Sequence, residues 1–420
     1  MSRSSISARV FCLLILLLGL FVLNGGSTWA EGDGDEYPSA EVVVKPQPGV
    51  PIARINARYG TATISRITET NLYLLALPPG ETVEELLPQL NADPDVLYAE
   101  LNYYAEHPDT GQRYFGASGG PGARGYYDQW AVATIQAARA HPYSTGAGVI
   151  VAVLDTGVDL DHPALVDRLV PGYDFVGMDS DPSDAPNGLD DDSDGLVDEG
   201  TGHGSHVAGI VALVAPGANI MPVRVLNSDG IGTYYEIAQG IVYAADHGAR
   251  VLNLSLTAPH NAASLEAALE YAFGRGCVIV AAAGNGGGAG PAPYPAAYKR
   301  GDDLYVIAVG ASDRQAQVAS FSATDPDVVD VYAPGVDIYS TYYDGGYAWW
   351  SGTSMAAPFV AGEAALLGSL FEWNGYEVAR WVREHVVPID PSNRGESDQE
   401  GPGRIDVHAA VAGALSSLPP

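Results

Sequence analysis

The spacing of apolar and polar positions changes near residue 129, and the two regions on either side are predicted to have different folds. In the first region, residues 31–106, short apolar runs typical of strands alternate with two amphipathic segments typical of helices. The expected elements are a strand at 41–45, a helix at 51–59, strands at 61–67 and 71–77, a helix at 82–90 and a strand at 96–99. This order predicts a small α+β domain with ferredoxin-like topology.

The second region, residues 129–415, alternates apolar runs rich in Val, Ile and Leu with longer helical patterns. The expected strands are 149–154, 220–226, 251–256, 277–283 and 304–309, and the expected helices are 203–214, 234–247 and 264–273. Runs of this kind are typical of strands buried on both faces. The alternation therefore predicts an α/β fold in which a parallel sheet is sandwiched by helices in three layers. In such sheets, ligands bind beyond the carboxyl ends of the strands.

Residues 107–128 separate the two regions, show no hydrophobic periodicity and are rich in glycine. Segments with these properties are usually exposed linkers, and exposed linkers are the preferred sites of proteolytic cleavage. We therefore expect any cleavage between the two regions to fall here.

The amino terminus has the pattern of a secretory signal peptide. Arg3 and Arg9 precede an apolar run at 10–23, and small and polar residues follow as far as Ala30. The run is well short of the roughly 20 residues that a membrane-spanning helix needs. Residues 1–30 are therefore expected to be removed, leaving a secreted, extracellular protein without a membrane anchor. Cys277 then remains without a second cysteine, which excludes an internal disulfide.

The charge balance restricts the partners of the protein. Lys and Arg together number 20 and Asp and Glu 51, which gives a formal net charge of −31. Nucleic acids and anionic membranes both attract basic surfaces, so neither is expected as a partner. The hydrophobic content of 47% is consistent with a folded protein that has a large core.

Four polar residues occupy positions where the predicted sheet would place a ligand site. Asp155 follows the strand at 149–154, His203 opens a helix, Asn285 follows the strand at 277–283, and Ser354 opens a helix of small apolar residues. Each residue also has an alternative interpretation. Asp155 could simply form a turn, and Asn285 could be a turn residue in the left-handed conformation. Ser354 could cap the helix, and His203 could be structural or bind zinc together with His206. Together, they indicate nucleophilic catalysis assisted by an acid, a base and an amide donor.

The motifs around these residues closely resemble the four signatures of the subtilisin-like serine proteases. They are Asp-Thr-Gly at 155–157, His-Gly-Ser-His-Val-Ala-Gly at 203–209, Ala-Gly-Asn at 283–285 and Gly-Thr-Ser-Met-Ala-Ala-Pro at 352–358. The resemblance implies that Ser354 attacks the peptide carbonyl, that His203 is the general base and that Asp155 orients the imidazole. It also implies an oxyanion hole formed by the Asn285 side chain and the Ser354 backbone N–H.

The resemblance extends to substrate binding and to the first domain. Extended substrate would pair with two segments as an added strand, and Tyr234 would wall a distal pocket. The substrate-binding residues implied in this way are Gly230, Gly232, Tyr234, Leu254, Ser255 and Leu256. Thr257 stands where the family usually has a glycine, which suggests a narrower primary pocket. Residues 31–106 resemble the family's propeptide, which acts as a folding chaperone and an intramolecular inhibitor.

An acidic insertion at 179–199 has the spacing of a calcium-binding loop. Asp190, Asp192 and Asp194 alternate as in the opening of an EF-hand loop. The usual closing Glu is missing, so Asp198 or Glu199 would have to replace it. A structural calcium ion is expected here, since carboxylates this dense repel one another without a cation. A solvated acidic loop is the alternative.

These observations predict a secreted, monomeric serine endopeptidase that acts on proteins or peptides and is made as an autoprocessed precursor. A catalytically silent binding or scaffold module on the same fold is the alternative. An esterase of another hydrolase family would need a Gly-x-Ser-x-Gly elbow and the order Ser, acid, His, and the chain has neither.

Overall fold

The structure is a computed structural model that describes residues 36–109, 113–114, 122–288, 292–299, 305–370, 372–389 and 402–417. The expected signal peptide at 1–30 and most of the expected linker lie outside these residues. Within the described residues, no helix is long and apolar enough to cross a membrane.

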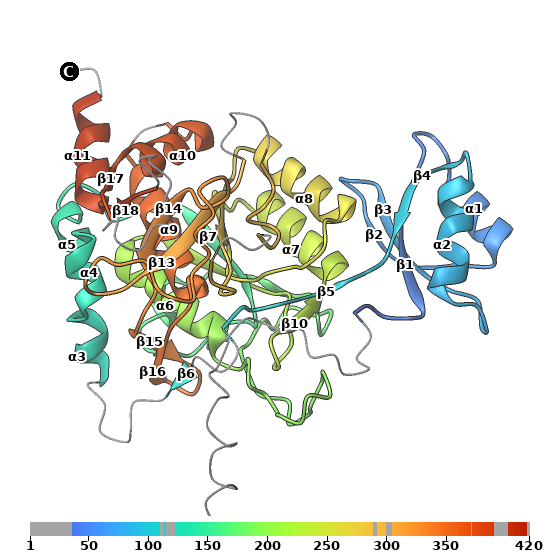
Figure 1. The fold of residues 1–420 in the computed structure, drawn as a ribbon, viewed down its shortest axis with the longest axis horizontal. Coiled ribbons are helices and arrows are strands. Elements are labelled where there is room, and N and C mark those ends of the chain that lie inside the picture. Colours follow the sequence, from blue (N-terminus) through green and yellow to red (C-terminus); the bar gives the residue numbers. More distant parts are fainter. Residues whose placement is uncertain are drawn as a thin grey trace, which may run out of the picture.

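The amino-terminal region forms a separate small domain with the predicted order of elements (Figure 1). Its elements are β1 (Glu41–Pro46), α1 (Ile52–Tyr59), β2 (Ala62–Ile67), β3 (Leu72–Ala76), α2 (Val83–Ala92) and β4 (Val96–Glu100). The strands pair antiparallel in the order β2-β3-β1-β4. One face of the sheet packs against the two helices around Val42, Val44 and Leu90, and residues of the other face, such as Val43 and Leu74, belong to a core cluster of the large domain. The ferredoxin-like split topology expected from the sequence is thus what the structure shows.

The large domain is built on a nine-stranded sheet with the order β17-β18-β14-β13-β12-β11-β7-β9-β8. All neighbours are parallel except β17 and β18, which pair antiparallel at one edge. The strands are β7 (Ile150–Asp155), β8 (Tyr173–Asp174), β9 (Asn219–Arg224), β11 (Val251–Leu254), β12 (Val278–Ala282), β13 (Ile307–Ser312), β14 (Val331–Pro334), β17 (Val386–Val387) and β18 (Arg404–Ile405).

Helices cover both faces of this sheet and produce the expected three layers (Figure 1). The side-chain alternation of β7 shows how: Val151 and Val153 pack with α6 and α9, whereas Ala152 and Leu154 pack with α7 and α8. The helices of the domain are α3 (Gly122–Tyr127), α4 (Trp130–Thr134), α5 (Ala137–Ala140), α6 (His203–Val214), α7 (Tyr234–Asp246), α8 (Ala263–Gly274), α9 (Thr353–Gly368), α10 (Gly375–Glu384) and α11 (Val407–Ser417).

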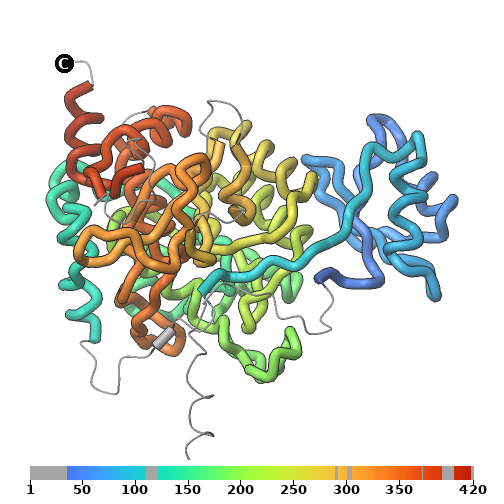
Figure 2. The backbone as a smooth tube through the Cα atoms, in the orientation of Figure 1, coloured from blue at the N-terminus to red at the C-terminus, as the bar shows by residue number. Residues whose placement is uncertain are grey.

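Residues 104–109, called the strap from here on, connect the small domain to the large one. Figure 2 shows this segment in cyan, running from the small domain along the surface of the large domain. Its first part is β5 (Tyr104–Glu106), which pairs antiparallel with β10 (Ile231–Thr233). Further along the chain, β6 (Arg113–Tyr114) pairs with β16 (Gly346–Trp350), which forms a hairpin with β15 (Ile338–Tyr342).

Residues 107–109 of the strap are also the first three residues of the linker expected at 107–128. His107 and Asp109 are both buried. The lack of periodicity does not reflect exposure here, because a single extended segment that pairs with the edges of a cleft buries both of its faces.

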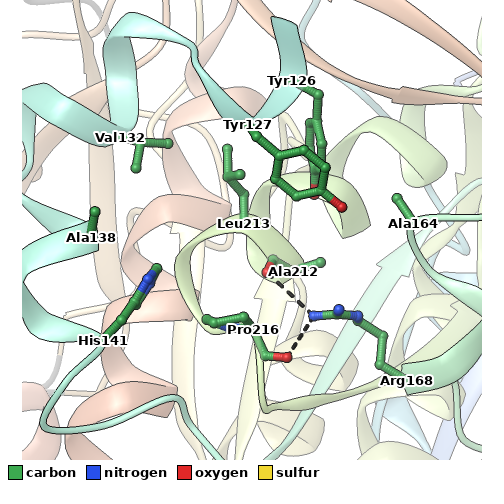
Figure 3. Close-up of a pocket in the computed structure, with 10 residues that line it drawn as sticks. All are labelled: Tyr126, Tyr127, Val132, Ala138, His141, Ala164, Arg168, Ala212, Leu213 and Pro216. Carbon is green, nitrogen blue, oxygen red and sulfur yellow. Dashed lines mark hydrogen bonds between the residues drawn. The ribbon is translucent and has the colours of Figure 1, made fainter. Parts of the chain in front are cut away.

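A hollow of about 300 Å³ lies on the large domain beside the end of α6 (Figure 3). Tyr126 and Tyr127 line one side of it, and the Arg168 guanidinium on the other side donates to the carbonyl oxygens of Ala212 and Pro216. His203 begins α6 and these carbonyls lie near its end, so the hollow is roughly 15 Å from the first turn of the helix.

Candidate active site

Asp155 and His203 meet at the carboxyl end of the sheet. Asp155 is the last residue of β7, and His203 is the first residue of α6. His203 Nδ1 lies 2.7 Å from Asp155 Oδ1, and both side chains are fully buried. The approach depends on Gly204, because a Cβ at that position would lie 2.1 Å from the carbonyl oxygen of Gly157.

Ser354 lies in the first turn of α9, whose sixteen residues are all buried. Its hydroxyl donates to the carbonyl oxygen of Ser255 at 3.2 Å, and the Ser255 hydroxyl donates to the Ser354 carbonyl oxygen at 2.8 Å. The helix N-terminus places the positive end of the helix dipole beside Ser354, which favours negative charge there.

Asn285 follows β12, and its side-chain amide is oriented by the start of α9. Asn285 Oδ1 accepts hydrogen bonds from the backbone N–H and the hydroxyl of Thr353, both at 2.9 Å. A backbone N–H can only donate, so the Asn285 oxygen must face Thr353 and the nitrogen must face the cleft. There, Asn285 Nδ2 donates to the Pro108 carbonyl oxygen at 2.9 Å. The side chain thus acts as a hydrogen-bond donor to a peptide carbonyl.

The strap lies in the cleft as an added strand. Ala105 is opposite Gly232, and the His107 N–H donates to the Gly230 carbonyl oxygen at 3.2 Å. On the other side, Glu106 and Thr257 exchange two backbone hydrogen bonds of 3.0 and 2.7 Å. This places a peptide between the segment that contains Gly230 and Gly232 and the segment that runs from Leu254 into Thr257.

The suggested substrate-binding residues have different positions in the structure. Ser255 contacts Ser354, whereas Leu254 and Leu256 are fully buried in the core beneath the cleft. The second segment forms its backbone pair through Thr257, beyond these three residues. Tyr234 is also buried, with its hydroxyl donating to the His260 carbonyl oxygen at 3.0 Å.

Carboxylates face both ring nitrogens of His203. Asp155 lies at Nδ1, and Asp109 Oδ2 lies 3.0 Å from Nε2. Burial opposes the charging of the imidazole, but Asp155 and Asp109 outweigh it and raise the pKa of His203 to about 10. Both nitrogens can donate at once only in the imidazolium form. The two carboxylates therefore favour the imidazolium form of His203 while the strap is in place.

His206 has a structural role in this geometry. Its Nε2 faces the carbonyl oxygens of Ile338 and Ala348 at 3.2 and 3.1 Å. Burial, and then the nearby charge of His203, lower the pKa of His206 to about 3. The two histidines face different partners, so the described residues give no support to a zinc site shared by them.

Two residues near the site were not found by sequence reasoning. The buried Asp184 carboxylate accepts hydrogen bonds from Thr156, Gly202 and Ser205, so it ties the end of β7 to the start of α6. Trp350 packs edge-on against the His203 ring, with 5.0 Å between the ring centroids. Neither lies in a recognisable motif. Asp184 was hidden among the other acidic residues of the insertion.

The acidic insertion lies beside the segment that carries Gly230. The buried Asp229 carboxylate, adjacent to Gly230, accepts hydrogen bonds from the backbone N–H groups of Asp191 and Asp198. Burial, and then the charge of Asp192, raise the pKa of Glu106 in the strap to about 7. The negative charge of the insertion thus acts on a carboxyl group of the strap.

Two overlapping groups of carboxylates converge within the insertion. Oxygens of Asp190, Asp192 and Asp194 lie within 4.8 Å of one another, as do oxygens of Asp192, Glu199 and Asp229. Burial, and then the charge of Asp229, raise the pKa of Glu199 to about 7. The carboxylate of Asp198 belongs to neither group, and it accepts hydrogen bonds from the backbone N–H groups at 187 and 188.

Comparisons with known proteins give the family. Residues 146–389 match the subtilase family, and residues 25–102 match the fervidolysin N-terminal prodomain. Thermitase of Thermoactinomyces vulgaris is 44% identical over 293 residues, which cover 67% of this chain and 95% of thermitase. A thermophilic serine proteinase of Bacillus sp. (strain AK1) is 42% identical over 341 residues, covering 78% of this chain and 76% of that protein.

A solved structure supports the fold. Fervidolysin from Fervidobacterium pennivorans, described as a keratinolytic enzyme related to subtilisin, matches with a TM-score of 0.72 and 26% identity. The match covers 90% of this chain and 62% of the fervidolysin chain, so this protein spans less than two thirds of that neighbour. The chain belongs to the subtilase family of serine peptidases and carries an N-terminal prodomain of the fervidolysin kind.

Proposed function

We propose that this protein is an exported serine endopeptidase in which Asp155, His203 and Ser354 form the catalytic triad and Asn285 contributes to the oxyanion hole. The observation that carries the proposal is the Asn285 amide, which is oriented by Thr353, the residue before Ser354, and donates to a peptide carbonyl. Four chemically matched groups at one end of a sheet are expected for acyl transfer and have no evident use in a silent binding module.

The proposed reaction proceeds in two halves. Ser354 Oγ adds to the substrate carbonyl carbon while its proton passes to His203 Nε2. The carbon–nitrogen bond then breaks, and His203 returns the proton to the leaving amine. Water attacks the resulting ester by the reverse route, which restores the Ser354 hydroxyl. Asp155 holds Nδ1–H and stabilises the imidazolium, while Asn285 donates to the oxyanion.

The amino-terminal domain is proposed to inhibit the enzyme until it is removed. The strap occupies the edge where an extended substrate would pair, so substrate and strap compete for the same hydrogen bonds. The domain ends where the strap begins, which keeps the strap at high effective concentration. Export is proposed from the signal-like sequence at 1–30.

A calcium ion is proposed for the acidic insertion, as a structural rather than a catalytic ligand. Two groups of three carboxylates converge there, and oxygen donors of this kind suit Ca²⁺. Asp192 belongs to both groups, so it is the residue expected to matter most. The ion would neutralise the mutual repulsion of these carboxylates and hold the insertion against the edge that carries Gly230.

Labelling with an organophosphate serine reagent tests the enzymatic proposal. The reagent should modify the processed protein once, on the peptide that contains Ser354, and abolish its cleavage of a protein substrate at internal bonds. Ser354→Ala is the control and should remain unlabelled, as an unprocessed precursor. Stoichiometric labelling elsewhere, or full activity of the labelled protein, would exclude the proposed mechanism.

A further inference from the structure

Asp109 occupies the centre of the proposed active site. The residue is 1% exposed, and its side chain is fully buried. One carboxylate oxygen lies 3.0 Å from His203 Nε2, and the other accepts a hydrogen bond from Asn285 Nδ2. Gly352 makes room for it, since a Cβ there would lie 1.6 Å from Asp109 Oδ1. A single carboxylate thus contacts both the proposed general base and the proposed oxyanion donor.

The peptide bond that precedes this carboxylate contacts the proposed oxyanion donor. The carbonyl oxygen of Pro108 accepts from the same Asn285 amide, so the Pro108–Asp109 bond is presented to the oxyanion donor. The Ser354 hydroxyl donates to the Ser255 carbonyl oxygen at 3.2 Å. The nucleophile and the base are therefore each engaged by a group other than the scissile carbonyl.

The charges around His203 explain how such a contact could slow the reaction. Asp155 on β7 and Asp109 on the strap both stabilise the imidazolium. The other titratable groups nearby are His107, which stacks on His203 at 4.6 Å, the neutral His206 on α6, and Asp184, which is close to Asp155. An imidazolium cannot accept the Ser354 proton.

We infer, on the basis of the proposed function, that Asp109 restrains self-cleavage of the precursor: its carboxylate keeps His203 protonated and competes for the Asn285 amide, so the Pro108–Asp109 bond is presented but cut slowly. Cleavage occurs in those molecules in which His203 has first released its proton to solvent: Ser354 Oγ then bonds to the Pro108 carbonyl carbon, and the Ser354 proton goes to His203 Nε2. His203 then protonates the departing Asp109 amine. Water releases the Pro108 carboxylate and restores Ser354. Asp109 becomes the amino terminus of the chain that carries His203 and Ser354, and once it is no longer joined to Pro108 it can move away from His203.

The test is the rate at which the full precursor processes itself. Precursor is diluted from denaturant into buffers from pH 5 to 10, and its intact mass and new amino terminus are followed with time. Asp109→Asn keeps the shape of the side chain and removes its charge. Asp128→Asn removes one exposed linker charge as a matched control, and Ser354→Ala provides the baseline without cleavage.

We expect Asp109→Asn to process at least about tenfold faster than wild type near pH 7, because losing one neighbouring charge lowers a pKa by about one unit or more. The rising limb of its pH–rate profile should move to lower pH by about the same amount. Asp128→Asn should match wild type. In wild type, the first new amino terminus should be Asp109. Equal or slower processing of Asp109→Asn, or a first cut at another bond, would overturn the inference.

A second measurement addresses the possibility that Asp109→Asn folds poorly. In the uncleavable Ser354→Ala precursor, an NMR titration of His203 should show a lower pKa once Asp109→Asn is added, and an unchanged pKa would refute the restraint. Failure of the proposed function looks different, since the wild-type precursor would then not cut itself and Ser354 would not be labelled by the serine reagent.

Discussion

Asn285 provides the sharpest test of the catalytic geometry, because its two side-chain atoms have separable roles. Nδ2 donates to the carbonyl at the cleft, whereas Oδ1 accepts two hydrogen bonds from Thr353 in the first turn of α9. Asn285→Ala removes both roles. Asn285→Asp retains the acceptor for Thr353 and removes the donor. Comparing the two variants in the processed enzyme therefore separates catalysis from the support of the helix that carries Ser354.

The expected magnitudes follow from these contacts. Loss of the donor should lower kcat by about 100- to 1000-fold with little change in KM, a range that comes from the equivalent donor in subtilisin itself rather than from this geometry. Loss of the two bonds to Thr353 should lower the free energy of unfolding by a further 1–3 kcal/mol or so in Asn285→Ala alone. Asn285→Asp should retain more of the stability but lose at least as much kcat.

The assay combines kinetics with stability. A chromogenic peptide substrate gives kcat and KM after titration of active sites, and thermal unfolding is followed on enzyme inactivated with a serine reagent, so that autolysis does not interfere. If kcat were unchanged in both variants, Asn285 would have no part in the oxyanion hole. If the two variants were equally destabilised, the hydrogen bonds to Thr353 would not be what orients the amide.

Three further predictions concern bound calcium and buried groups. If the insertion binds calcium, a chelator should lower the midpoint of thermal inactivation, because an ion bound only to the folded state stabilises that state by mass action. The double variant Asp192→Asn, Asp194→Asn should no longer respond to the chelator. A full response in the double variant would place the ion elsewhere. Burial raises the pKa of Cys277 to about 11, and its thiol donates to a backbone carbonyl oxygen at 3.3 Å, so a thiol reagent should not modify the native enzyme; rapid stoichiometric modification would contradict this. Burial also raises the pKa of Glu363 in α9 well above its ordinary value, so wild-type stability should fall as pH rises from the unfolded-state pKa through the folded-state pKa. Glu363→Gln should then have a melting temperature that exceeds the wild-type value more at pH 9 than at pH 5, and a pH-independent difference would refute the assignment.

The sequence by itself indicated the main elements of both domains and the candidate residues of the site. Apolar runs such as 251–256 and 277–283 are recognisable because a strand buried on both faces needs apolar residues at successive positions. The helix at 203–214 agrees with α6 in both of its bounds. The four motifs were also visible in the sequence, because each is local: every one follows a strand or opens a helix.

Tertiary structure alone decided which distant groups meet. Asp109 contacts His203, 94 positions away in the sequence, and the contact depends on the path of the strap between β10 and Thr257. The same holds for Asp184, whose carboxylate joins β7 to α6 although its sequence context is an acidic loop. Local patterns specify which face of an element is buried. The contact between Asp109 and His203 depends instead on the path of the chain across the large domain. That is why His107 and Asp109, at the start of a segment expected to be exposed, are instead buried, and why Asp109 carries the carboxylate that faces His203.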